Sequence, residues 1–106
     1  SPKECRFLQS LNQVLEHTEV EFYHSGDLDY GGIKIFLYIQ KNLFPELQPL
    51  MMDVRTYEKY RDYAEKIEDT TLEKLKKLQI ENPVLRQLAE KLVKEKKGIE
   101  QESFLL

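Results

Sequence analysis

The chain has 106 residues, of which 41% are hydrophobic and 33% charged, and its formal net charge is −3. This length suits at most one domain. The acidic balance argues against a protein that coats nucleic acid nonspecifically, because such a protein would be basic. The single cysteine, Cys5, excludes an internal disulfide and fits the cytoplasm, where we expect the protein to reside. No apolar run approaches the roughly 20 residues of a membrane span, so we expect no membrane partner.

The first segment, 2–17, has apolar residues at helical spacing, and Pro2 suits a first helical turn. The residues of this stripe are Phe7, Leu8, Leu11, Val14 and Leu15. The pattern predicts a helix that packs through one face.

The segment 19–36 predicts a strand, a tight acidic turn and the start of a helix. Val20, Phe22 and His24 alternate with more polar residues, which is the period of a strand with two different faces. We expect His24 to be a packed histidine and not a ligand, since a site for a hard cation prefers oxygen.

Dense apolar residues from Ile33 onwards predict a mostly buried helix that ends before Pro45. Lys34 and Lys41, seven residues apart, indicate its one solvent-exposed stripe. The two glycines at 31–32 interrupt the pattern at the junction between turn and helix.

Asp27 and Asp29 are the candidate functional residues because they share one constrained turn at the end of a strand. Ligands of open α/β sheets bind at the carboxyl ends of strands. Two carboxylates aimed at one point repel each other unless a cation lies between them, and Mg²⁺ or Mn²⁺ suits such oxygen ligands. The alternative is that these acids only form the turn or cap the following helix.

The second half of the chain predicts one more strand and several helices. Residues 50–52 are apolar and bounded by turn signals, which predicts a buried strand. Asp53 then fits a helix N-cap better than a further acid of the site. Residues 54–68 follow as an amphipathic helix that mixes tyrosines with both basic and acidic residues.

Two shorter helices complete the prediction. Thr70 and Glu73 fit a capping box at the start of the first. Asn82 and Pro83 are a cap and a first-turn proline for the second, and Gly98 is expected to close it. The fold class is therefore α/β, with a short parallel sheet flanked by about five helices.

The run S-G-D-L-D-Y-G-G-I-K-I-F at 25–36 resembles the G-D-x-D-x-x-G-x-x-I pattern of TOPRIM domains, the metal-binding domains of topoisomerases, primases and related nucleases. The chain is similar to the TOPRIM-like C-terminal domain of the D component of the Wadjet plasmid-defence system, a relative of the topoisomerase VI A subunit. Further likeness comes from F-P-E-L at 44–47, M-D at 52–53 and G-I-E-Q-E at 98–102, so that it covers about residues 19–106.

The resemblance implies a partial TOPRIM-like fold over residues 1–106, cut at its N-terminal side, because TOPRIM domains place a glutamate on an earlier strand. It implies a bacterial DNA-cleaving subunit in which Asp27 and Asp29 are catalytic and hold Mg²⁺ (or Mn²⁺). Glu100 and Glu102 would be additional acids at the metal. The implied partners are double-stranded DNA, contacted through the parent protein, and the subunits of an SMC-type complex. We expect this part of the protein to be inactive alone.

Two other functions stay open at this point. One is a D-x-D-x-T phosphatase with Asp27 as nucleophile and Asp29 as acid, although Gly31 stands where that pattern has threonine. The other is a non-catalytic interaction module whose helices form a docking surface. The exposed edges of a two-stranded sheet also predict self-association as a two-fold homodimer.

Overall fold

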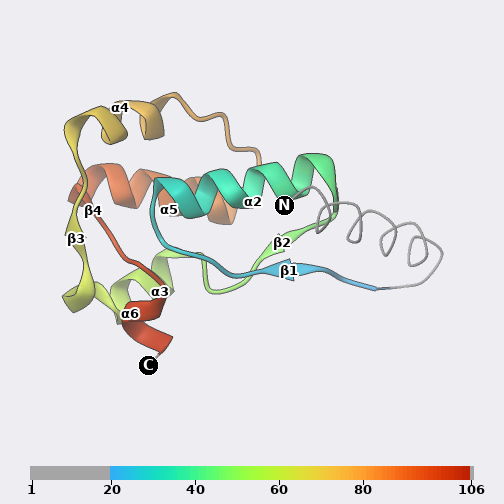
Figure 1. Cartoon of the computed structure of the whole chain (residues 1–106), viewed down its shortest axis with the longest axis horizontal. Coiled ribbons are helices and arrows are strands. Elements are labelled where there is room, and N and C mark those ends of the chain that lie inside the picture. The colour runs from blue at the N-terminus through green and yellow to red at the C-terminus, as the bar shows by residue number, and fades with distance from the viewer. Residues whose placement is uncertain (1–19, 106) are drawn as a thin grey trace.

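The computed structural model describes residues 20–105, and Figure 1 shows their arrangement. The predicted helix at 2–17 lies outside the described residues. Five α-helices lie in the described part, namely α2 (Tyr30–Asn42), α3 (Val54–Lys59), α4 (Asp69–Lys77), α5 (Pro83–Glu95) and α6 (Glu102–Leu105). The strands are β1 (Tyr23–His24), β2 (Gln48–Pro49), β3 (Glu65–Lys66) and β4 (Lys97–Gly98), and a 3-10 turn spans Arg61–Tyr63.

The strands form two small pairs. β1 and β2 are parallel, with Tyr23 opposite Gln48, while β3 and β4 are antiparallel. A single bridge between Leu28 and Ile99 joins the segment after β1 to the segment after β4. The predicted α/β class, with a short parallel sheet and five helices, is therefore confirmed for the described residues. The antiparallel pair was not predicted.

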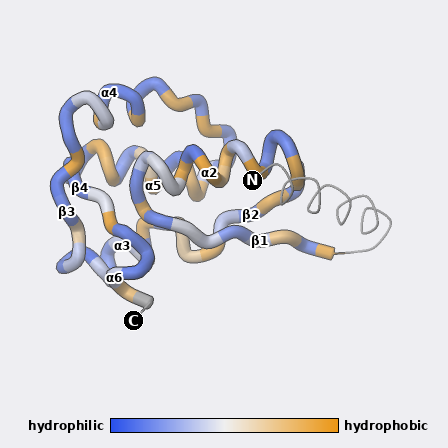
Figure 2. Tube along the Cα trace, viewed as in Figure 1, coloured by the Kyte–Doolittle hydropathy of each residue, from blue (hydrophilic) through white to orange (hydrophobic). Residues whose placement is uncertain are grey.

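Helix α5 is the centre of the packing, since it contacts α2, α3, α4 and β4. Its buried residues are Leu85, Leu88, Ala89 and Leu92. Hydrophobic and hydrophilic residues alternate along α5 in Figure 2, as expected for a helix with one buried stripe. The predicted start is confirmed, because Asn82 Oδ1 accepts hydrogen bonds from the backbone N–H groups of Val84 and Leu85 and Pro83 is the first helical residue.

The predicted helix at 54–68 is wrong beyond its first part. α3 ends at Lys59, and the chain then forms the 3-10 turn and β3. β3 pairs with β4, and the N–H of Ile67 donates to the carbonyl of Lys96 at 2.9 Å. Pairing with a distant strand has thus overridden a local helical pattern, which is a common effect of tertiary context.

The predicted strand at 50–52 is also wrong in position. β2 lies two residues earlier, and its parallel pairing to β1 ends where the N–H of Leu50 donates to the carbonyl of His24. Met51 has a φ of 57° and so turns the chain away from the extended conformation. Met52 is fully buried, so the apolar signal marked a core contact after the strand.

Two predicted helix ends differ from the structure as well. α4 begins at Asp69, which places Thr70 inside the helix and leaves no capping box there. α5 ends at Glu95, and its C-cap Lys96 takes the left-handed conformation itself with a φ of 59°. Gly98 therefore does not close α5 but lies in β4, two residues after Lys96.

Helix α2 is less buried than the sequence predicts. Ile33 and Phe36 are buried, but Ile35 and Tyr38 are 55% and 56% exposed, so the exposed stripe is not limited to lysines. The reason is that α2 packs on α4 and α5 through one face only. Its end at Asn42, before Pro45, agrees with the prediction.

The C-terminal segment is held against α3. Tyr57 is buried and its hydroxyl donates to the backbone carbonyl of Lys97 at 3.1 Å. The ring of Phe104 stacks on that of Tyr60 with 4.3 Å between the centroids. These contacts hold β4 and the residues after it against α3, and the bridge between Leu28 and Ile99 holds the same segment next to the loop that follows β1. No helix among residues 20–105 is long and apolar enough to cross a membrane.

Candidate functional site

The loop 25–29 connects the carboxyl end of β1 to the first turn of α2 (Figure 1). Asp29 is the N-cap of α2, because its Oδ1 accepts the backbone N–H of Gly32 at 2.8 Å. Its backbone carbonyl also accepts the first helical hydrogen bond, from Ile33. The capping role considered for this acid is therefore confirmed, and Asp29 is oriented by the helix that it caps.

Asp27 is oriented by a segment far away in the sequence. Its Oδ1 accepts the backbone N–H of Gln101 at 2.6 Å, and the Gln101 side chain donates to Ser25 Oγ, also at 2.6 Å. Between these contacts, Leu28 and Ile99 exchange two backbone hydrogen bonds of 2.8 and 2.9 Å. The residues after β4 thus fix both the backbone of the acidic loop and the position of one acid.

Two glycines allow this close packing. A Cβ on Gly32 would overlap the backbone carbonyl of Asp27. A Cβ on Gly98 would lie 3.0 Å from the Cβ of Asp29 and 3.1 Å from the carbonyl oxygen of Leu28. Both positions therefore require glycine because another backbone segment lies against them.

The two aspartates interact with each other electrostatically. Burial is the main cause that raises the pKa of Asp29, and the neighbouring negative charge of Asp27 raises it further. The hydrogen bond from the Gly32 N–H acts in the opposite direction and lowers this pKa. A half-buried carboxylate next to a second carboxylate is a site where a bound cation would be stabilising.

More acids lie close by. The negative charge of Glu102 is the main cause that raises the pKa of Glu100, followed by burial and by the charges of Glu65, Asp27 and Asp29. The structure therefore brings Glu100 close to Asp29, whereas Glu102 lies close to Glu100. A hollow of about 140 Å³ lies here, and its lining includes Asp29, Glu65 and Glu100 together with one cation, Lys66.

Comparison with known proteins identifies the family. A family model described as Wadjet protein JetD, C-terminal, matches residues 6–105. The chain belongs to the Wadjet JetD C-terminal family. A relative from Bacillus cereus (strain Q1), named Wadjet protein JetD, is 44% identical over 100 residues, which cover 92% of this chain and 24% of the relative. The chain thus spans about a quarter of the length of that relative. No solved structure matches this chain significantly.

The match confirms the Wadjet resemblance that the motifs indicated. The wider relation to TOPRIM domains and to the topoisomerase VI A subunit stays a prediction. The matched residues include the acidic loop and the segment 98–102, so both halves of the site belong to the JetD-family region of the chain.

The donor set of this JetD-family domain fits Mg²⁺ or Mn²⁺ in its chemistry. Asp27 and Asp29 each use Oδ1 in a hydrogen bond, and within residues 20–105 no hydrogen bond occupies either Oδ2. Mg²⁺ is usually bound through one or two carboxylates and retains several waters. In the same residues no group of three histidine, cysteine, aspartate or glutamate side chains is placed to hold a metal ion. Metal binding by Glu100 and Glu102 therefore stays a prediction.

Two other polar residues that the sequence analysis considered have structural roles. His24 is half-buried, its ring centroid lies 6.1 Å from that of Phe36, and burial lowers its pKa. Asp53 is the N-cap of α3, as predicted, and its Oδ1 accepts the N–H of Thr56 at 2.7 Å.

Sequence reasoning missed several residues of this site. Ser25 and Gln101 were not singled out, and Glu65 and Lys66 were placed in a helix. One available signal was the apolar Ile99 between Gly98 and Glu100, in an otherwise charged stretch, which is compatible with a short strand that has one buried face. The pairing partner of that strand has no local signal.

Proposed function

We propose that this domain supplies part of the metal site of a bacterial DNA-cleaving subunit that acts with an SMC-type complex against plasmids. The observation that carries the proposal is the acidic loop, where Asp27 and Asp29 are each held by one oxygen while the second oxygen accepts no hydrogen bond within residues 20–105. Membership of the Wadjet JetD C-terminal family supports the plasmid-defence context.

The residues of the chain have distinct roles in this proposal. Asp27 and Asp29 hold Mg²⁺ (or Mn²⁺), which when bound offsets charge on the scissile phosphate and the leaving oxygen. The N–H groups of Gly32 and Gln101 keep the two carboxylates in place before the metal binds. Such preorganisation reduces the cost of arranging the ligands at the moment of reaction.

The surrounding acids make the approach of DNA dependent on the cation. Glu65 and Glu100 add negative charge next to Asp29, with which they line one hollow, and the charge of Glu102 acts on Glu100. A phosphate would be repelled by this group of carboxylates in the absence of metal. The rest of the parent protein would provide the main contacts to double-stranded DNA, since this chain is acidic overall.

A non-catalytic interaction module is the second candidate. The exposed side chains of Ile35 and Tyr38 on α2 favour it, because apolar side chains that lie one turn apart on an open helix face are typical of a docking surface. In that case the acidic loop would serve only to cap α2 and to anchor the residues after β4.

The test uses a full-length protein that carries this domain, together with its SMC-type partner complex, in a plasmid-nicking assay with Mg²⁺. Asp27→Asn and Asp29→Asn should each abolish cleavage, since both remove a metal-binding charge, and Asn can still cap α2. Glu102→Gln should have a smaller effect. The full-length protein without Mg²⁺, and this domain alone, should not cut.

The matched control is Asp53→Asn, which changes a capping aspartate outside the acidic loop and should leave cleavage unchanged. Circular dichroism of each variant reports whether it is folded. Full cleavage by a folded double variant, Asp27→Asn with Asp29→Asn, would overturn the nuclease proposal and favour the interaction module.

A further inference from the structure

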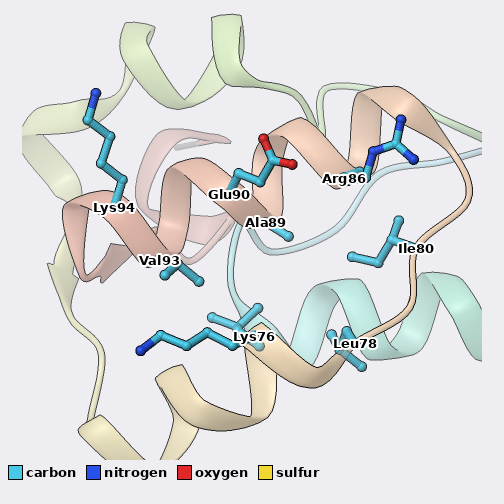
Figure 3. A pocket seen from close by; sticks show the side chains of 9 residues that line it. Lys76, Leu78, Ile80, Arg86, Ala89, Glu90, Val93 and Lys94 are labelled. Atoms are coloured by element: carbon cyan, nitrogen blue, oxygen red, sulfur yellow. The ribbon is translucent and has the colours of Figure 1, made fainter.

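An apolar groove of about 420 Å³ lies between α4 and α5. In Figure 3, Ala89 and Val93 of α5 point toward the gap that Leu78 and Ile80 border from the other side. Leu78 and Val93 are only half-buried, so the groove presents apolar surface that the rest of the described chain does not cover. This volume lies within the usual range of ligand-binding clefts.

The rim of the groove is basic. Lys76, Arg86 and Lys94 line it together with a single acid, Glu90. An adjoining hollow of about 590 Å³ shares Ile80 and Arg86 with the groove and adds one base and one acid, Lys41 and Glu81. The two hollows together therefore have four basic and two acidic residues, although the whole chain has a net charge of −3.

The basic side chains of the rim are available to a ligand. Lys76 pairs with Glu73 at 3.1 Å, but both side chains are more than half exposed, so this ion pair is weak and is readily exchanged for another. Within residues 20–105 neither Arg86 nor Lys94 forms an ion pair.

The charge of the rim indicates which kind of partner the groove can bind, a second copy of this chain or another protein. A second copy of this chain whose two-fold axis passes through the groove would face its own rim, and like charges would then oppose each other. An acidic partner would instead meet complementary charge. We infer that this groove binds an amphipathic helix of a partner protein, whose apolar side chains enter between α4 and α5 and whose flanking acidic residues pair with the basic rim.

The spacing of the groove residues suits a helix. Ala89 and Val93 are four residues apart and therefore one turn apart on α5. Apolar anchors of a bound helix recur at three- and four-residue intervals, so successive anchors of the partner can contact the two in turn. This inference does not depend on the metal site, because none of the groove residues lies in the acidic loop.

Two synthetic peptides test the inference on the 106-residue chain. Both are 16-residue helices with leucines at positions i, i+3, i+4 and i+7, one flanked by glutamates and the other by lysines. Chemical-shift changes in NMR spectra should be centred on Leu78, Ala89 and Val93 with the acidic peptide. The basic peptide should bind at least tenfold more weakly, and added salt should weaken binding of the acidic peptide.

Variants of the chain make the test specific. Arg86→Glu should lower the affinity of the chain for the acidic peptide at least tenfold. Lys34→Glu makes the same charge change on the exposed face of α2 and should leave this affinity unchanged. Val93→Ser should also weaken binding, and circular dichroism checks that it is folded.

Three results would overturn the inference. One is equal binding of the two peptides, and another is shift changes centred away from the groove. The third is a concentration-dependent shift at Ala89 and Val93 without any peptide, which would assign the groove to a second copy. Mn²⁺ binding, measured separately, should be the same in Arg86→Glu as in the unchanged chain, so failure here is distinct from failure at the acidic loop.

Discussion

The acidic loop at 25–29 and helix α5 are stabilised in different ways. α5 has its cap, its first-turn proline and its apolar stripe within one continuous segment. The loop is instead held by Gln101, which lies 74 residues from Asp27 and 76 from Ser25. The comparison teaches that α5 is specified locally, whereas the candidate site exists only once the two ends of the described chain have come together.

The largest loss of stability is expected for Gly32→Ala, in the first turn of α2 next to the acidic loop. Its Cβ would overlap the Asp27 carbonyl group, so the backbone must shift, and the free energy of unfolding should fall by about 3 kcal/mol or more. Gly31→Ala is the matched control. Its Cβ would meet only Asp29 Oδ1 at 3.5 Å. Because alanine suits a helix better than glycine, the free energy of unfolding should rise by about 0.5 to 1 kcal/mol.

Urea unfolding of the two variants measures this difference. A similar gain of stability in both variants would show that helix propensity at 31–32 decides the outcome, and the close approach of Asp27 to α2 would then be wrong.

Leu88→Ala tests the other side of the comparison. Leu88 is fully buried in α5, so its truncation should lower the free energy of unfolding by about 3 kcal/mol. Val84, which is 40% exposed on the same helix, is the control, and Val84→Ala should change stability by less than about 0.5 kcal/mol. Comparable losses for both in urea unfolding would contradict the packing of α5.

Two variants of Asp29 separate the contribution of the helix cap from that of the carboxylate charge. In chain treated with EDTA, Asp29→Ala should lower the free energy of unfolding by about 1 kcal/mol through loss of the cap, while Asp29→Asn should retain the cap. Thermal unfolding followed by circular dichroism measures both. Equal losses in the two variants would show that the carboxylate charge, and not the cap, stabilises α2.

The raised pKa of Asp29 also sets a pH dependence. Between the ordinary aspartate pKa and the raised one, the folded chain binds more protons than the unfolded chain. The contribution of Asp29 to stability is therefore full below the ordinary pKa and is lost as the pH rises through the folded value. Asp29→Asn should remove this decline, and an unchanged pH profile in that variant would contradict the burial of the carboxylate.

The smallest loss of stability is expected when the side-chain contact between Gln101 and Ser25 is removed. Gln101→Ala and Ser25→Ala should each lower the free energy of unfolding by about 0.5 to 1 kcal/mol, because each removes one hydrogen bond. The double variant should lose little more than either single variant, since both remove the same contact. Additive losses would show that the two side chains act independently.

The sequence predicts what is encoded locally. Asn82 and Pro83 predict the start of α5, and Asp53 predicts the cap of α3, because these signals act within one helical turn. The parallel pairing of β1 with β2 also agrees with the prediction in kind, although β2 lies earlier than expected. Asp27 and Asp29 lie at the end of a strand, where the sequence places them.

The rest depends on contacts between distant segments. Residues 61–66 follow a helical pattern, but β3 forms because β4 is available to pair with it. Gln101 has no feature that marks it as a partner of Asp27, since its backbone N–H makes the contact and every residue except proline has one. The gathering of Glu65 and Glu100 around the loop follows from this pairing and could not be predicted without it.

A titration of the chain with Mn²⁺, followed by paramagnetic broadening in NMR spectra, tests the central claim that the acidic loop binds a divalent cation. We predict that broadening is centred on Asp27 and Asp29 and extends to Gln101, that Mg²⁺ competes for the site, and that the variant with both Asp27→Asn and Asp29→Asn loses the effect. Broadening centred on other acids, such as Glu73 of α4, or broadening that persists at the loop in this double variant, would contradict the account.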